Sequence, residues 1–131
     1  MIWYRIPLRP VTKKNSQRII RVNGRLMIIP SAQYRKYEKE ASAWLIPTEP
    51  PIDYPVNVKC TYYFHPNKDG SIPKNLPDLV NLIEATCDVL VKNKILADDN
   101  CQIIRTHDGS EVIYSPLEDE RTEVEITRLD M

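Results

Sequence analysis

The alternation of apolar and polar residues predicts β-strands along much of the chain. Runs in which every second residue is apolar, and which are rich in Val, Ile and Tyr, are typical of strands. Asn23-Gly24 separates two such runs and accepts the positive φ angles of a type I′ turn, so these two runs are predicted to form a hairpin. The expected strands cover residues 2–8, 18–22, 25–29, 56–64, 102–105, 111–114 and 122–128.

Two other segments show apolar residues at helical spacing. The first contains Tyr34 and Tyr37 and is predicted to run over residues 32–45, with Ser31 as its N-cap. The second is predicted over residues 78–92, with one apolar stripe facing the core. The expected fold class is therefore α+β, with a mixed β-sheet packed by two main helices in a single domain of 131 residues.

Composition excludes several classes of protein. The apolar fraction of 42% and the charged fraction of 27% are ordinary for a globular chain. No apolar run approaches the roughly 18 residues that a membrane helix needs, and the first residues do not resemble a signal peptide. The three cysteines fit neither a zinc spacing nor a disulfide framework, so we expect reduced thiols, a cytoplasmic location and no membrane partner.

The net charge is zero, but the charges are unevenly distributed. Residues 1–40 contain ten Lys or Arg and two acidic residues, so the remainder carries a matching acidic excess. Such asymmetry either is neutralised within the fold or indicates contact with nucleic acid. Lys13, Lys14, Arg18 and Lys74 are the candidates for phosphate contacts, and the alternative for each is an ordinary solvated side chain.

The acidic residues concentrate in and after the second predicted helix. Asn81, Glu84 and Asp88 fall on its polar side, and Asp98 and Asp99 follow its end. Carboxylate and amide oxygens are ligands for Mg²⁺ or Mn²⁺ rather than zinc, and these ions assist phosphodiester hydrolysis. The acids from the two ends of the helix can meet if the chain doubles back, or if a second subunit brings its own set nearby.

Each acidic residue also has an ordinary structural interpretation. Asp78 could be a helix N-cap, Glu84 and Asp88 could form a solvated helix face, and Asp98 and Asp99 could belong to a turn. His65 and His107 lie in predicted turns, where a surface role is expected. With three glycines in all, the chain has no glycine-rich phosphate loop.

The acidic segment resembles a known family of DNA enzymes. Residues 77–82 (Pro-Asp-Leu-Val-Asn-Leu), then Asp88 and the Asp98-Asp99 pair, are similar to the P-D-x-D-N-L pattern and later aspartates of RusA-like Holliday junction resolvases. The resemblance implies a homodimeric, Mg²⁺-dependent nuclease of phage or prophage origin that cuts four-way DNA junctions symmetrically. It also implies that Asp78 and Asp99 are metal ligands and that Asn81 matches the family asparagine.

Two positions depart from the family pattern. Val80 replaces the second acid, and Glu84 stands where the family often has a basic residue. The hypothesis is that Asp78, Glu84 and Asp99 bind the metal and carry catalysis. Asn81, Asp88 and Asp98 are then expected to support these ligands through hydrogen bonds. The alternatives are a dimer that binds branched DNA without cutting it, and a metal-dependent nuclease or RNase with another substrate.

Overall fold

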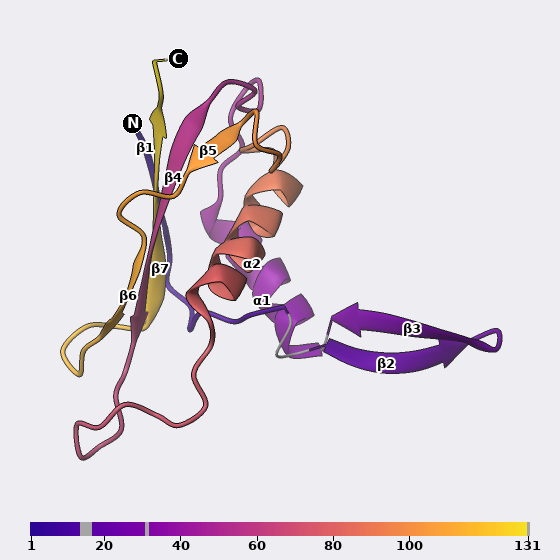
Figure 1. Ribbon diagram of the computed structural model, residues 1–131, viewed down its shortest axis with the longest axis vertical. Coiled ribbons are helices and arrows are strands. Elements are labelled where there is room, and N and C mark those ends of the chain that lie inside the picture. The colour runs from indigo at the N-terminus through magenta and orange to yellow at the C-terminus, as the bar shows by residue number, and fades with distance from the viewer. Residues whose placement is uncertain (14–16, 31, 131) are drawn as a thin grey trace.

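The computed structural model describes residues 1–13, 17–30 and 32–130 (Figure 1). The predicted N-cap Ser31 lies outside these residues. Seven strands, two α-helices and one 3₁₀ helix follow one another along this part of the chain. They are β1 (Ile2–Ile6), β2 (Gln17–Val22), β3 (Arg25–Pro30), α1 (Ala32–Ala41), the 3₁₀ helix η2 (Ser42–Trp44), β4 (Val56–Phe64), α2 (Leu79–Lys92), β5 (Ile104–Thr106), β6 (Glu111–Tyr114) and β7 (Arg121–Arg128).

Five of the strands form one mixed sheet. The order is β1-β7-β4-β5, and β6 also pairs with β4. The pairs β1–β7 and β7–β4 are antiparallel, whereas β5 and β6 both run parallel to β4. Strand β5 pairs with the start of β4 and β6 pairs with its end, so the two short strands share one side of β4. The predicted α+β class is confirmed.

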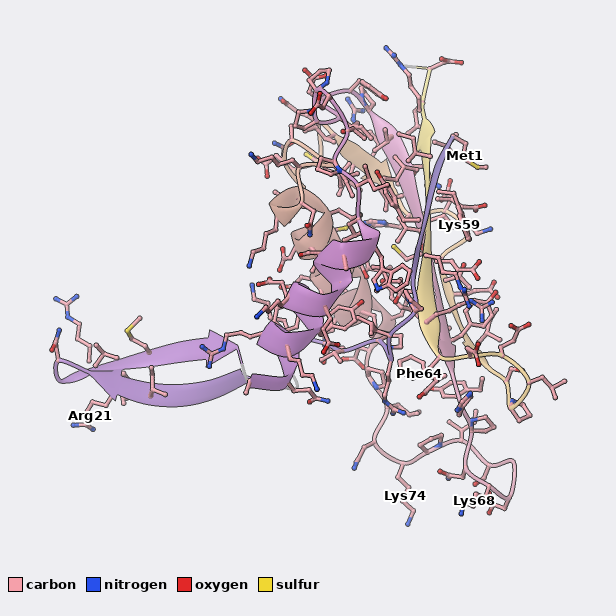
Figure 2. All side chains as sticks on the ribbon, turned by 180° about the vertical axis from the view of Figure 1, so that it is seen from behind. Met1, Arg21, Lys59, Phe64, Lys68 and Lys74 are labelled. Carbon is pink, nitrogen blue, oxygen red and sulfur yellow. The ribbon has the colours of Figure 1, made fainter. Side chains whose placement is uncertain are left out.

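Both α-helices lie against the same side of this sheet (Figure 1). The reason is the strict alternation along β4, which buries every second side chain from Val56 to Phe64. These side chains pack with Tyr34 and Tyr37 of α1 and with Leu82 of α2 in one apolar core. The opposite side of the sheet carries polar pairs, and Figure 2 labels Lys59 there.

The chain doubles back directly after α2. Lys94 adopts a positive φ of 61°, and the amide of Ile95 donates to the carbonyl of Leu90 (3.0 Å). Ile95 and Leu96 are then buried, and Leu96 forms a parallel bridge with Ile52. The reversal returns the acidic turn of residues 98–100 toward the body of the molecule.

Element boundaries differ from the prediction by two residues or more at three places. Strand β1 ends at Ile6 rather than at residue 8, and α1 ends at Ala41, where a 3₁₀ turn replaces the predicted last helical turn. Strand β5 begins at Ile104 rather than at residue 102. The amides of Ile103 and Ile104 donate to the carbonyl of Asn100 (3.1 and 3.0 Å), which makes residues 100–103 a turn.

The predicted hairpin is confirmed. Strands β2 and β3 pair with each other in a sheet of their own, and Asn23 and Gly24 have φ angles of 50° and 76°. Within the part of the chain that the structure describes, neither helix is long and apolar enough to cross a membrane.

A buried hydrogen bond between β4 and α2 gives a stability prediction. The hydroxyl of Thr86 donates to the carbonyl of Leu82 (3.0 Å), so the hydroxyl of Tyr62 must donate to Thr86 Oγ1 (2.6 Å). Thr86→Val should lower the free energy of unfolding by about 1–3 kcal/mol, because it leaves the Tyr62 hydroxyl buried without this acceptor. Urea denaturation measures this loss.

Tyr62→Phe is the matched control for this prediction. It leaves Thr86 bonded to Leu82, so its cost should be smaller, about 0.5–1.5 kcal/mol. A Tyr62→Phe loss as large as that of Thr86→Val would contradict the assigned direction of the hydrogen bond.

Candidate active site

Asp78 presents an exposed carboxylate at the start of α2. It occupies the N-cap position with extended backbone angles, but its side chain makes no capping hydrogen bond. The carboxylate instead accepts a long hydrogen bond from Nδ2 of Asn81 (3.4 Å). The interpretation of Asp78 as a side-chain cap is therefore wrong, and its carboxylate faces solvent beside the family asparagine position.

Glu84 and Asp99 line the same cavity. The first comes from the exposed side of α2, and the second comes from the turn that follows the chain reversal. The cavity has a volume of about 280 Å³, and the full set of lining residues is Val80, Ile83, Glu84, Cys87, Asp99, Ile104 and His107. Two of the three predicted ligands thus meet at one cavity, and Asp78 is not among its lining residues.

The neighbouring acids Asp98 and Asp99 have opposite electrostatic environments. Asp98 accepts hydrogen bonds from the Asp99 amide (2.7 Å) and from Nδ2 of Asn100 (3.1 Å), and these bonds lower its pKa. Partial burial, followed by the adjacent Asp98, raises the pKa of Asp99. Asp98 therefore stabilises the turn. The ionised carboxylate of Asp99 is disfavoured where it lies, and a nearby cation would stabilise it.

Asp88 has a cationic partner of its own. Its carboxylate is half-buried and lies 3.2 Å from Nζ of Lys13. This contact joins the basic loop before β2 to α2. Lys13, predicted to contact phosphate, is thus anchored beside the acidic helix. Of the other predicted contacts, Lys14 lies outside the described residues and Arg18 lies on β2.

His107 is a site residue that the sequence did not reveal. It is half-buried rather than on the surface, and Nδ1 lies 2.8 Å from the carbonyl oxygen of Val58. Because a carbonyl oxygen only accepts, Nδ1 carries the hydrogen, and Nε2 of the neutral ring is a hydrogen-bond acceptor. His65, by contrast, is exposed as expected, and its Nε2 contacts the carbonyl of Glu118.

The loop that carries His107 is fixed to β4. Asn57 accepts hydrogen bonds from the Asp108 amide (2.7 Å) and the Thr106 hydroxyl, and its Nδ2 donates to the Asp108 carbonyl (3.2 Å). The hydroxyl of Ser110 accepts from the Cys60 amide (3.0 Å). These contacts hold residues 107–110 between β5 and β6. These contacts depend on strand register, so the sequence alone did not place His107 at the site.

A larger and more polar cavity adjoins the start of α2. Its volume is about 740 Å³, and it is lined by Arg9, Pro10, Val11, Thr12, Gln33, Phe64, Lys74, Asn75, Leu76 and Pro77. Pro77, which lines the cavity, directly precedes Asp78 in the sequence. Figure 2 shows Lys74 and Lys68 on the loop that extends from the end of β4, near Phe64. Lys74 lines this cavity, and its contact with phosphate remains a prediction.

The fit of the acidic residues to a divalent cation is partial. Over residues 1–13, 17–30 and 32–130, no group of three or more His, Cys, Asp or Glu side chains is arranged to hold a metal ion. Oxygen donors of the type that Mg²⁺ and Mn²⁺ prefer nevertheless share the cavity of Glu84 and Asp99. The joint role of these two residues with Asp78 as metal ligands remains a prediction.

Comparison with known families gives one match. The family described as Endodeoxyribonuclease RusA matches residues 7–127. The match includes the basic loop, both α-helices, the acidic turn and the His107 loop. A search among curated proteins gives no match.

The raised pKa of Asp99 predicts an opposite pH dependence for two adjacent variants. The fold is favoured by protonated Asp99, and this contribution is lost as the pH rises above the ordinary value of 3.8 through the raised pKa. Without divalent ions, Asp99→Asn should therefore become more stable relative to wild type between about pH 4 and pH 7. The gain should be within about 0.5 kcal/mol, as at other exposed sites.

Asp98→Ala provides the control, because its pKa is lowered and its carboxylate stabilises the fold at neutral pH. That variant should lose stability relative to wild type as the pH rises. Urea denaturation at several pH values in EDTA measures both effects. A loss for Asp99→Asn at neutral pH would contradict the assigned environment.

Proposed function

Because the match covers nearly the whole chain, the protein belongs to the RusA endodeoxyribonuclease family, and we propose that it resolves Holliday junctions or related branched DNA by paired, metal-dependent nicks. The observation that carries this proposal is the meeting of Glu84 and Asp99 in one cavity beside α2. Glu84 lies in the first half of α2, whereas Asp99 follows the reversal after the end of this helix. Their convergence is what a phosphodiesterase site built on carboxylates requires.

The proposed cofactor is Mg²⁺, with Mn²⁺ as a substitute. Glu84 and Asp99 would hold it from their shared cavity, with Asp78, which does not line that cavity, as the expected third ligand. When bound, the ion would supply an acidified water nucleophile and stabilise the leaving oxygen. Glu84 takes the place of the acid that the family has at Val80, since its longer side chain extends from the next turn of the helix. The raised pKa of Asp99 supports this proposal, because a nearby cation offsets unfavourable ionisation.

His107 would orient the attacking water in this site. Its Nδ1 is committed to the Val58 carbonyl, so Nε2 is the acceptor that remains for a hydrogen bond from water in the cavity. The contacts of Asn57 hold the loop and therefore the ring.

The larger cavity would receive the DNA backbone. Arg9 and Lys74 line it, and both are exposed cations close to the Asp78 end of the acidic helix. Contacts of this kind bind phosphate without reading bases, which suits an enzyme that selects a branched shape. Two nicks across a two-fold symmetric junction require two sites, so we propose that the active form is a homodimer.

One observation favours a second candidate. Val80 lines the same cavity as Glu84 and is 74% exposed, so an apolar side chain stands where the family has an acid. A dimer that binds branched DNA without cutting it fits this replacement. The two candidates differ in whether Glu84 restores the lost ligand.

Junction nicking tests the proposal. With Mg²⁺ present, Asp78→Asn, Glu84→Gln and Asp99→Asn should each lower the rate by about 100-fold or more, because each removes a charged ligand. Asp53→Asn, which alters an exposed acid outside both cavities, should leave the rate unchanged. The rates are measured on a labelled four-way junction and on a linear duplex of the same sequence.

The other outcomes identify the alternatives. Junction binding without any cleavage at saturating Mg²⁺ or Mn²⁺ would establish the non-catalytic dimer. Equal cleavage of junction and duplex would point to a nuclease with another substrate. Full activity of Glu84→Gln would remove Glu84 from the ligand set.

Lys74 and Lys68, which lie on the same loop after β4, give a prediction for DNA binding. Lys74→Ala should weaken binding to junctions of any sequence and reduce the slope of log affinity against log salt by about one. Lys68→Ala removes the same charge from an exposed position of the same loop that does not line the cavity, and it should leave the slope unchanged. Equal effects of the two substitutions would rule out a specific backbone path through the cavity.

A further inference from the structure

The β2–β3 hairpin is an arm that projects from the body of the protein (Figure 1). Its two strands pair only with each other among the described residues, and each has six residues, or about 20 Å of extended chain. Figure 2 labels Arg21 near the far end, well away from the helices. The arm therefore places its side chains at a distance from both cavities.

The arm exposes large apolar side chains on both faces. Leu26 is 69% exposed, Met27 is 46% exposed and Val22 is 40% exposed. Since residues opposite each other in an antiparallel pair share a face, Leu26 lies on one face with Arg21, and Val22 lies on the other with Arg25. An isolated two-stranded hairpin is marginally stable in water, and exposed apolar groups of this kind mark a binding surface.

The charge of the arm indicates what covers it. Residues 17–30 contain three arginines and no acidic residue. Arg21 and Arg25 are both exposed, and the ion pairs among the described residues include neither of them. Packing two such arms together would bring like charges into contact, whereas a polyanion complements them.

We propose that this arm lies in a groove of one duplex arm of the branched DNA, beside the branch point. The inference rests on the proposed function for the identity of its ligand. A DNA major groove is about 12 Å wide and admits a two-stranded ribbon. With one arginine on each face, Arg21 reaches one phosphate wall of the groove and Arg25 reaches the other. Leu26, on the face of Arg21, and Met27, on the face of Arg25, each cover apolar sugar atoms beside the wall that their face meets.

The test uses the full chain and a labelled four-way junction in EDTA, which prevents metal-dependent cleavage. The double variant Arg21→Ala/Arg25→Ala should lower the salt slope of binding by about two and weaken affinity at least 10-fold near physiological salt. The double variant Arg5→Ala/Arg105→Ala removes the same charge from exposed positions on the main sheet and should bind as wild type does. Light scattering and circular dichroism on each variant measure the molecular mass and the fold.

The outcomes separate the possible occupants. Loss of affinity with unchanged mass and fold supports the groove contact, and Leu26→Ser/Met27→Ser should then also reduce affinity. A lower mass in the arginine or the serine variant would mean that a second copy covers the arm, which overturns the proposal, as would binding equal to that of the control. If the wild-type protein binds the junction through the arm but never cuts it, the proposed function is wrong and this inference stands. If the wild-type protein cuts the junction but the arm variants bind as tightly as wild type, this inference is wrong and the proposed function stands.

Discussion

The packing of β4 is the constraint on which the rest of the structure depends. This strand pairs with β7 on one side and with both β5 and β6 on the other. Its buried face carries the two α-helices, and the hydrogen bond between Tyr62 and Thr86 ties it to α2. The backbone of Val58 and the side chain of Asn57 also hold the His107 loop. One strand therefore positions both walls of the cavity that contains Glu84 and Asp99.

The acidic residues around α2 differ in whether the fold supplies partners for their charge. Asp88 is compensated by Lys13, and Asp98 is stabilised by hydrogen bonds within its own turn. Asp78 and Glu84 remain exposed, and the ionised form of Asp99 is disfavoured. Solubility alone would be satisfied if all five carboxylates were exposed to water. The division between compensated and uncompensated carboxylates is what makes the second group the candidate for cation binding.

Most of the secondary structure could be predicted from the sequence, because alternation and helical spacing follow directly from burial on one face of a strand or helix. The apolar stripe of α2 and the Asn-Gly hairpin are examples.

The candidate site was harder to predict from the sequence. Glu84 and Asp99 could be named as acids, but their meeting depends on the reversal at Lys94 and on the bridge between Ile52 and Leu96. His107 could not be placed, because its contact with Val58 arises from pairing between distant strands. The alternative interpretation of Asp78 as a side-chain cap is wrong, because Asp78 occupies the N-cap position but its carboxylate makes no capping hydrogen bond.

The division of one sheet edge into β5 and β6 has a consequence for how this architecture can diversify. Pairing with β4 anchors the chain on both sides of residues 107–110, so insertions or exchanges there leave the register of the flanking strands intact. The chemistry of the cavity wall can thus change within this loop while β4 and the core packed on it stay the same. Comparison of relatives that keep β4 but differ in residues 107–110 would distinguish the contribution of the loop to activity from that of the sheet that holds it.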